Sequence, residues 1–348
     1  MQLNFMGNAA AMSELCDLTA TDLRQMIGCK DISPVELIDA CIERIEMVNG
    51  SLNAIVTKSY DRARLEARNA EKAVLSGDKL GVLHGIPVGI KDLDATADIR
   101  TTSGSQLYAE HIPAVDHGVV ANIRSAGGII LGKTNTPEFG AGANTRNLVF
   151  GATGNPFDPV KTCGGSSGGS AVALATGMVP LASGSDYGGS LRTPASFCGV
   201  VGIRPSPGVV ADDGRSVGLL PFSVLGPMGR TVDDAYMLLR AQVAPNPHDP
   251  FATLSTFELD AKLESADLSS INAMITSDLG TAVMSKAYRK IFAERSKIFR
   301  HYFAMAIDET PDFADGDNCF EVLRGVNFVA AHGARVGTHR ELLSPNVV

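Results

Sequence analysis

Apolar residues recur at helical spacing in the first third of the chain. Positions three and four residues apart form one apolar face: Ile38, Cys41, Ile42 and Ile45. Before them, Ser33, Pro34 and Glu36 have the arrangement of a capping box with proline in the first turn. This pattern predicts a helix that begins after Ser33, and the Ala- and Arg-rich stretch 60–75 predicts another.

Short apolar runs follow and alternate with helical stretches. Runs at 85–90, 128–131 and 179–182 have the length and composition of buried strands, and 116–126 and 171–176 are typical of helices. Such alternation predicts an α/β fold, in which helices cover both faces of a central sheet.

The last hundred residues follow a proline-rich stretch at 245–250. An apolar run near 271–275 comes next, and helices are expected over about 282–303 and 319–334. Residues 246–348 are therefore expected to form a further segment after the core.

Composition and charge exclude several classes of protein. The chain is 45% hydrophobic and 20% charged, with 30 basic and 38 acidic residues and a net charge of −8. Without a basic cluster it lacks the electrostatic signature of a nucleic-acid-binding protein. No apolar run reaches the roughly 18–20 residues that span a bilayer, so no membrane partner is expected.

The N-terminus and the cysteines both favour a cytoplasmic protein. Residues 1–11 contain no basic residue and no apolar block of signal-peptide length, and they predict a loose extension, with Met12 as an alternative start. The six cysteines form no C-x-x-C pair and no zinc-type spacing with histidine, so free thiols are expected.

Two short motifs match well-known patterns in the wrong context. Residues 127–134 fit the phosphate-loop expression, but Ile129, Ile130 and Leu131 have the character of a strand where a curled loop is needed. Residues 164–168 fit the G-x-S-x-G nucleophile elbow, but 155–162 is not the strand that must precede it. Neither nucleotide binding nor an α/β-hydrolase is therefore expected.

Four longer motifs occur together and in order. They are Gly85-Ile-Pro-Val-Gly-Ile-Lys-Asp92, Gly132-Lys-Thr-Asn-Thr-Pro-Glu-Phe139, Gly164-Gly-Ser-Ser-Gly-Gly-Ser170, and the stretch from Gly184 to Gly199 that contains Asp-Tyr-Gly-Gly-Ser-Leu-Arg. Together they resemble the amidase signature family, with the likeness densest over 80–230. The resemblance implies a large mixed, mostly central sheet with helices on both faces.

The family resemblance implies a Ser–cis-Ser–Lys amide hydrolase. Matched by motif, Ser190 is the nucleophile, Ser166 is the bridging serine on a cis peptide, and Lys91 is the base. A serine hydroxyl needs a neighbouring base, and lysine can accept a proton only when burial keeps it neutral. Ser166 would then carry the proton between Ser190 and Lys91. No metal or organic cofactor is implied, and the partner is a small-molecule amide.

Glycines around the nucleophile fit the charge that develops during attack on an amide. In the family, the backbone N–H groups of Tyr187, Gly188, Gly189 and Ser190 would form the oxyanion hole. Tyr187 is bulkier than the residue expected beside these glycines. Gly140 matches a position that lines the substrate cleft. Asp186 and Arg192 flank the loop and are expected to hold its shape without taking part in the chemistry.

The resemblance also sets an expectation about domains. We expect residues 12–348 to form a single amidase signature domain, with a helical layer at 12–76, a catalytic core at 80–245 and an incomplete C-terminal segment at 246–348. Family members usually continue past this chain's end, so we expect either that this is a fragment or that a second chain or a homodimer contact covers the gap.

Two alternatives to a stand-alone amidase stay open. One is the amidase-fold subunit of a glutamine-dependent tRNA amidotransferase, although Thr193 stands where that branch commonly has glutamine. The other is a shortened, catalytically silent family member.

Overall fold

The computed structural model describes residues 14–215, 217–252, 259 and 263–348. The expected extension at 1–11 and the alternative start at Met12 lie outside these residues. The chain divides into two compact units, Met1–Leu259 with Ala331–Val348, and Asp260–Ala330. The single-domain organisation expected from the sequence stays a prediction.

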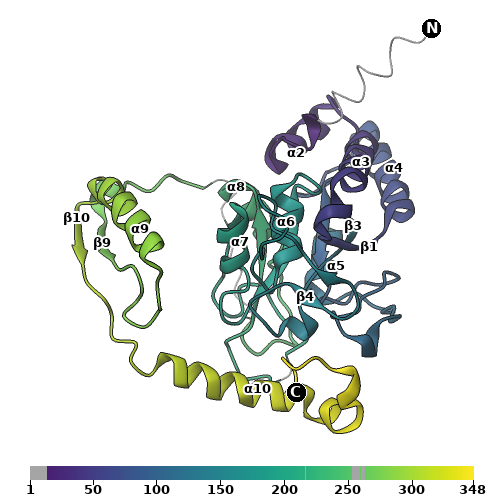
Figure 1. The fold of residues 1–348 in the computed structure, drawn as a ribbon. Coiled ribbons are helices and arrows are strands. Elements are labelled where there is room, and N and C mark those ends of the chain that lie inside the picture. Colours follow the sequence, from purple (N-terminus) through teal and green to yellow (C-terminus); the bar gives the residue numbers. More distant parts are fainter. Residues whose placement is uncertain (1–13, 216, 253–258, 260–262) are drawn as a thin grey trace. The chain divides into compact units, whose positions relative to one another are not determined.

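The first unit begins with helices. They are α2 (Ala20–Cys29), α3 (Pro34–Leu52) and α4 (Tyr60–Ser76). The predicted capping box of α3 is confirmed, because the Ser33 hydroxyl accepts the Glu36 N–H at 3.1 Å and the Glu36 carboxylate accepts the Ser33 N–H at 2.8 Å. Buried Leu37, Ile38 and Ile45 form the apolar face of α3 that joins the hydrophobic core. Figure 1 shows α3 beside α4.

A six-stranded mixed sheet forms the centre of this unit, in the order β1-β3-β2-β6-β8-β7. Its strands are β1 (Ile55–Lys58), β2 (Pro87–Lys91), β3 (Ile129–Thr134), β6 (Leu181–Asp186), β7 (Val201–Gly202) and β8 (Val224–Gly229). Strand β2 runs parallel to both of its neighbours, β3 and β6, whereas β1, β7 and β8 pair antiparallel. All residues of β2, β3 and β8 are buried, as expected for a sheet covered on both faces.

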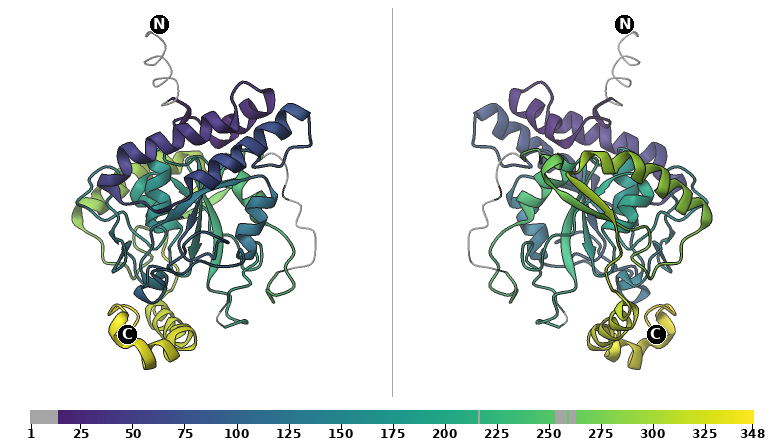
Figure 2. Two further views of the ribbon diagram at one scale, coloured as in Figure 1. Left: turned by 90° about the vertical axis from the view of Figure 1, so that its right-hand side faces the viewer. Right: turned by 90° about the vertical axis from the view of Figure 1, so that its left-hand side faces the viewer.

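Helices lie on both sides of the sheet (Figure 2). They are α5 (Gly118–Ser125), α6 (Gly168–Ala175), α7 (Arg192–Cys198) and α8 (Val232–Gln242). A Cβ atom placed at Gly184 and one placed at Gly229 would point to opposite faces of the sheet. The first would meet Ser167 at the start of α6, and the second would meet Asp234 of α8. Gly184 pairs with Gly226, three residues from Gly229, so the two positions face opposite ways.

Strand β3 explains why the phosphate-loop match is misleading. The residues of its G-K-T end, Gly132, Lys133 and Thr134, all belong to the strand and pair with β2. A backbone extended in a ladder cannot cradle a phosphate with its N–H groups. The sequence-based rejection of this motif is confirmed.

Short elements connect the larger ones. They are β4 (Arg146–Asn147), β5 (Gly151–Ala152), and the 3₁₀ turns η1 (Gln106–Tyr108), η2 (Glu138–Gly140) and η5 (Arg340–Leu342).

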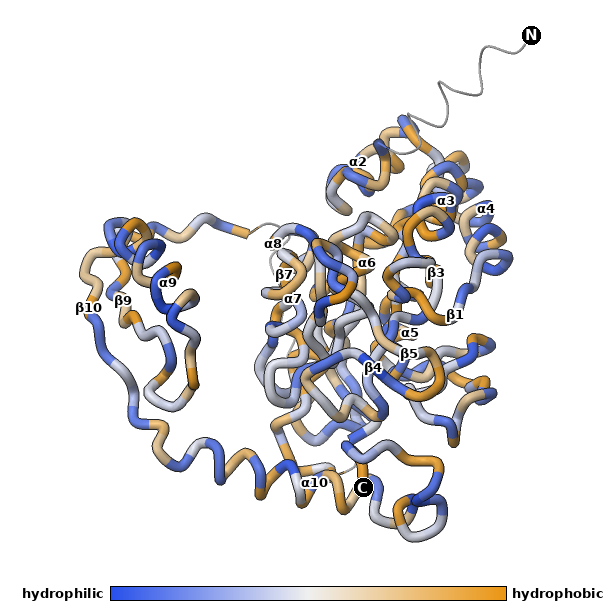
Figure 3. Tube along the Cα trace, viewed as in Figure 1, coloured by the Kyte–Doolittle hydropathy of each residue, from blue (hydrophilic) through white to orange (hydrophobic). Residues whose placement is uncertain are grey.

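The second unit contains a two-stranded parallel sheet. Its strands are β9 (Asn272–Ile275) and β10 (Met305–Asp308), and its helical elements are η3 (Leu268–Ser270), α9 (Lys286–Phe299) and η4 (Arg300–Tyr302). Helix α10 (Gly316–His339) begins in this unit and ends in the first. Apolar and polar residues alternate along α10 (Figure 3). Among the described residues, no helix combines the length and apolar character needed to cross a membrane.

Candidate active site

The parallel pairing of β2 with β6 brings two of the sequence motifs to one edge of the sheet. Lys91 is the last residue of β2, and Ser185 and Asp186 are the last residues of β6. Because the two strands run in the same direction, their carboxyl ends lie next to each other. In open α/β sheets this edge is where ligands are usually bound.

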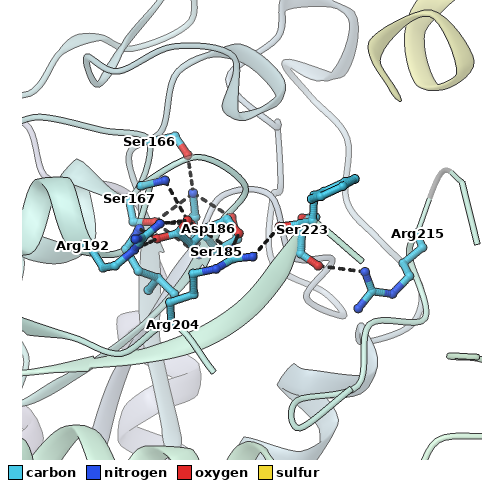
Figure 4. Close-up of polar contacts among 12 residues, drawn as sticks. Ser166, Ser167, Ser185, Asp186, Arg192, Arg204, Arg215 and Ser223 are labelled. Atoms are coloured by element: carbon cyan, nitrogen blue, oxygen red, sulfur yellow. Dashed lines mark hydrogen bonds and ion pairs between the residues drawn. The ribbon is translucent and has the colours of Figure 1, made fainter. Parts of the chain in front are cut away.

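Three serine hydroxyls surround the amine of Lys91. Its Nζ donates to Ser166 Oγ at 2.7 Å, to Ser167 Oγ at 2.9 Å and to Ser185 Oγ at 2.9 Å. Figure 4 shows these serines converging from the loop before α6 and from the end of β6. The side chain of Lys91 is 0% exposed. The amine is therefore cut off from bulk water and held against hydroxyl groups alone.

Burial sets the protonation of this amine. Removal from water disfavours the ammonium form and outweighs the attraction of the Asp94 and Asp186 carboxylates, so the pKa of Lys91 falls to about 7. A lysine with this pKa is partly neutral near neutral pH and can accept a proton, unlike an exposed lysine.

Ser166 lies just before α6. The Gly165–Ser166 peptide bond is cis, as the family resemblance implies for this position. Ser166 is 2% exposed, and its neighbour Ser167 donates to the Ser185 carbonyl at 3.3 Å. The structure thus brings together Lys91 and Ser166, two of the three residues singled out from the sequence.

Ser190 is placed next to this pair by the backbone. The Ser167 N–H donates to the Ser190 carbonyl at 3.2 Å. Within the described residues, no hydrogen bond joins the hydroxyls of Ser190 and Ser166. Ser190 is less buried than Ser166, so its hydroxyl is the one within reach of a substrate. Proton relay from Ser190 to Ser166 requires their hydroxyl groups to come within hydrogen-bond distance. Catalytic hydrogen bonds are often long without substrate and shorten when substrate binds.

Asp186 organises the loop that leads to Ser190. Its carboxylate accepts the Gly189 N–H at 2.7 Å and the Leu191 N–H at 3.2 Å, and it pairs with Arg192 at 3.0 Å. Burial alone would raise the pKa of Asp186, but the Arg192 guanidinium and the two amides outweigh it and lower the pKa to about 2. The carboxylate therefore stays charged and fixes the loop.

The Gly189 amide departs from the expected set of oxyanion donors. Because it already donates to Asp186, it is not directed at the position where an oxyanion would form. In the described part of the chain, the amides of Gly188 and Ser190 carry no hydrogen bond and stay available as donors. Gly189 adopts a φ of 112°, which L side chains rarely take, so glycine is required there for the turn itself.

Arg204 is a second arginine on Asp186, and sequence reasoning did not find it. Its guanidinium donates to the Asp186 carbonyl, to Asp186 Oδ1 at 3.2 Å and to the Phe222 carbonyl at 2.9 Å. Figure 4 shows it between Asp186 and the segment that carries Ser223. The Phe222 ring lies 6.0 Å from the ring of Tyr187. Arg204 therefore joins the loop before Ser190 to the 217–223 segment.

Gly140 lies beside Ser166, as expected for a residue of the cleft. A Cβ at Gly140 would lie 3.5 Å from Ser166 Oγ and 3.1 Å from Leu93 Cδ1, and its φ is 71°. The segment that follows Gly140 lines a cavity of about 510 Å³, together with residues 344–346. The residues that line this cavity do not include Lys91, Ser166 or Ser190.

Sequence reasoning missed four contributors besides Arg204. Ser167 and Ser185 hydrogen-bond the Lys91 amine, and Ser183 and Asp94 form the layer behind it. The three serines stand inside or directly beside the sequence motifs that contain Ser166 and Asp186. This closeness in sequence could have identified them as candidate site residues. Nothing in the local sequence marks Arg204 or Asp94.

Comparison with known proteins finds relatives among amidotransferase subunits and acylamidases. A glutamyl-tRNA(Gln) amidotransferase subunit of Alkaliphilus metalliredigens is 40% identical over 233 residues, which cover 67% of this chain and 48% of that protein. An acylamidase of Rhodococcus erythropolis is 34% identical over 298 residues, which cover 86% of this chain and 62% of that protein. The chain thus spans about half to three fifths of the length of these relatives.

Solved structures give the same result. A bacterial aryl acylamidase of the amidase signature family matches with a TM-score of 0.83 and 28% identity, covering 95% of this chain and 71% of that one. Fatty acid amide hydrolase matches with a TM-score of 0.80 at 23% identity, over 97% of this chain and 59% of that one, a likeness of fold.

A family model adds the decisive match. The model described as Amidase covers residues 36–300, which include Lys91, Ser166 and Ser190. The predicted mixed α/β fold is confirmed by these neighbours. The chain belongs to the amidase family, in its amidase signature group.

Proposed function

We propose that this protein is an amidase that hydrolyses a carboxylic amide through an acyl-enzyme on Ser190. The single observation that carries the proposal is the Lys91 amine, fully buried and held within 2.7–2.9 Å of three serine hydroxyls. A buried amine with a pKa of about 7 beside a serine is poised to act as a base.

In the first half-reaction, Ser190 Oγ attacks the amide carbon and its proton passes through Ser166 to the neutral Lys91 amine. The carbonyl π electrons move to oxygen, and the amides of Gly188 and Ser190 stabilise that charge. The C–N bond then breaks as the proton returns through Ser166 to the leaving nitrogen, which departs as ammonia or an amine. Lys91 is neutral again when the acyl-enzyme forms.

In the second half-reaction, water replaces the leaving amine. Lys91, through Ser166, takes a proton from water, whose oxygen attacks the acyl carbon. The ester bond to Ser190 breaks, the proton returns to Ser190 Oγ, and a carboxylic acid leaves. The net reaction adds one water across the amide bond.

A fluorophosphonate tests the proposal without knowledge of the substrate. This reagent phosphonylates an activated serine and loses fluoride, so the intact mass shows one adduct for each reactive hydroxyl. We expect a single adduct on the wild-type chain and none on Ser190→Ala. The matched control is Ser223→Ala, because the Ser223 backbone carbonyl, which accepts from the Arg215 guanidinium at 2.8 Å, is kept in the variant. Absence of an adduct from well-folded wild type supports instead the catalytically silent alternative.

A second candidate function rests on the 40% identity to the glutamyl-tRNA(Gln) amidotransferase subunit. In that role the same site would release ammonia from glutamine for transfer within a complex. Thr193, where that branch commonly has glutamine, argues against it. The discriminating assay is glutamine hydrolysis with and without added partner proteins and charged tRNA. A rate that rises only with these additions favours the amidotransferase role over a stand-alone amidase.

We also propose a small-molecule amide as the partner and a cytoplasmic location. All six cysteines are free, including exposed Cys29 and Cys319, which is the usual state in a reducing compartment.

A homodimer is proposed from the surface of the second unit. Large apolar side chains are exposed there: Val283, Tyr288, Ile291, Phe299 and Val329. A second copy of the chain would remove them from water. Sedimentation of the full chain at micromolar concentration tests this, and a monomer at all concentrations contradicts it.

A further inference from the structure

Behind the Lys91 amine lies a layer of buried polar groups that the proposed mechanism does not use. Asp94 is 4% exposed and Lys133 is 0% exposed. His117 lies near Asp94, because the His117 backbone N–H donates to the carbonyl of the next residue, Ala95, at 2.8 Å. A buried carboxylate is costly unless it has partners and a role. The question is therefore what Asp94 does at this position.

A short chain of hydrogen bonds joins Asp94 to Lys91. The Lys91 N–H donates to Ser183 Oγ at 2.9 Å, and the Ser183 hydroxyl donates to Asp94 Oδ2 at 3.1 Å. Ser183 lies on β6 and Lys91 at the end of β2, so this chain crosses between paired strands. The Asp94 N–H closes a turn onto the Lys91 carbonyl at 3.0 Å. Both backbone groups of Lys91 are thereby fixed with respect to Asp94.

We propose that Asp94 is a positioning residue for the reaction, which holds the backbone of Lys91 through Ser183 and favours the charged form of its amine through its own carboxylate. This inference rests on the proposed function and extends it by naming the group that tunes the base. Asp94 acts through Lys91 and Ser183 and does not reach the substrate.

The charges around this carboxylate support its role. Burial raises the pKa of Asp94, while His117, Lys133 and Lys91 each favour its ionised form. The carboxylates that face the Lys91 amine are those of Asp94 and Asp186, and each raises the pKa of Lys91 against the larger effect of burial. Removal of the Asp94 charge therefore leaves the Lys91 amine neutral at lower pH.

Lys133 and His117 are the basic groups packed behind Asp94, and their charges act against the effect of burial on its carboxyl group. Lys133 Nζ donates to the Asp94 carbonyl and to Thr96 Oγ1 at 2.6 Å, and burial lowers its pKa to about 8. The His117 ring accepts the Val119 N–H on Nδ1 at 3.3 Å, and its Nε2 lies 2.9 Å from Asp213 Oδ1.

Asp92 offers a matched control. It is also a buried carboxylate, two residues away, but its oxygens accept from the Thr102 N–H at 3.1 Å and the Thr102 hydroxyl at 2.5 Å. Its charge faces Lys133. Asp92→Asn and Asp94→Asn therefore replace the same carboxyl group on the same turn, and only the second replaces one that acts on Lys91.

The experiment measures the rate of fluorophosphonate labelling from pH 5 to pH 9 for wild type, Asp94→Asn and Asp92→Asn. In a plot of labelling rate against pH, the acid limb is the range in which the rate falls as the pH is lowered. We expect the acid limb of Asp94→Asn to lie at lower pH than that of wild type. One pH unit below the wild-type midpoint, it should label about threefold faster than wild type or more, the result of a displacement of about half a pH unit. Asp92→Asn should keep the wild-type limb.

Ser183→Ala tests the hydrogen-bond arm separately. It keeps the Asp94 charge and removes the link to the Lys91 backbone, so the plateau rate should fall about three- to tenfold. This variant also decides the matter if Asp94→Asn does not fold, since a wild-type plateau would then overturn the proposal.

The other outcomes are equally distinct. An acid limb of Asp94→Asn that stays in place or moves to higher pH overturns the inference, as does an equal displacement in Asp92→Asn. In either case the wild type still labels and the proposed function stands. Failure of the wild type to label at any pH instead removes the proposed function.

Discussion

The pH dependence of serine labelling is the most direct consequence of a buried lysine base. The ordinary lysine pKa of 10.5 falls to about 7 at Lys91. At pH 7 an ordinary lysine is neutral in about one molecule in 3,000, whereas about half of the Lys91 side chains are neutral. Burial therefore increases the concentration of working base about a thousandfold. Labelling of Ser190 should level off above pH 7 and fall about tenfold for each pH unit below it, to about 1% of the plateau at pH 5.

The assay follows intact mass after exposure of the full chain to a fluorophosphonate between pH 5 and pH 9. Far-UV circular dichroism at each pH checks that the fold is unchanged. Lys91→Arg is the matched control, because arginine keeps the charge and length but does not lose its proton. Above pH 7 it should label at least about a hundredfold more slowly than wild type, and the difference should shrink toward pH 5 as the Lys91 amine becomes protonated.

Two results would refute this reasoning. A midpoint at pH 9 or above would mean that Lys91 titrates as an exposed lysine does. An unchanged acid limb in Lys91→Arg would mean that some other group sets the rate.

Three further predictions concern the site and its loop. Ser190→Ala should lose roughly 10³–10⁶-fold in amide turnover with an unchanged circular dichroism spectrum, and turnover at the wild-type level would contradict its role as nucleophile. The pKa of Asp186 is lowered to about 2, so its ionised carboxylate adds about 2 kcal/mol to the free energy of unfolding. This contribution is complete above about pH 4 and is lost as the pH falls toward 2. Urea unfolding should therefore show an acid-dependent loss over this window that is smaller in Asp186→Asn, and equal losses would argue against it. Gly140→Ala should cost about 1 kcal/mol because of the φ of 71°. It should also slow labelling, because its methyl would lie only 3.1 Å from Leu93 Cδ1 and the turn beside Ser166 would have to shift; a wild-type rate would place Gly140 outside the cleft.

Much of the fold could be predicted because it follows from local patterns. The helix after Ser33 begins where its capping box indicates, and the apolar run near 128–131 proved to be strand β3. Capping and periodicity depend on residues a few positions apart, so a single chain displays them directly. Their ends were less accurate, and β3 extends to Thr134 because its pairing with β2 continues that far.

The candidate residues were also identifiable in the sequence, but their surroundings were not. Lys91, Ser166 and Ser190 stand in motifs whose order and spacing mark the family. The same motifs gave no sign that the Gly189 amide is taken up by Asp186, which happens because the loop turns back on that carboxylate.

Local patterns along the chain are enough to indicate most of its elements, its family and the residue types of its site. What those residues can do depends on how the chain packs in three dimensions. The pKa of Lys91 depends on complete burial and on the distances to Asp94 and Asp186, and the position of the Asp186 loop depends on Arg204 from a later segment. These quantities arise when strands and loops far apart in the chain are packed together. Desolvation and charge interactions vary with distance in space, which separation along the sequence does not reveal.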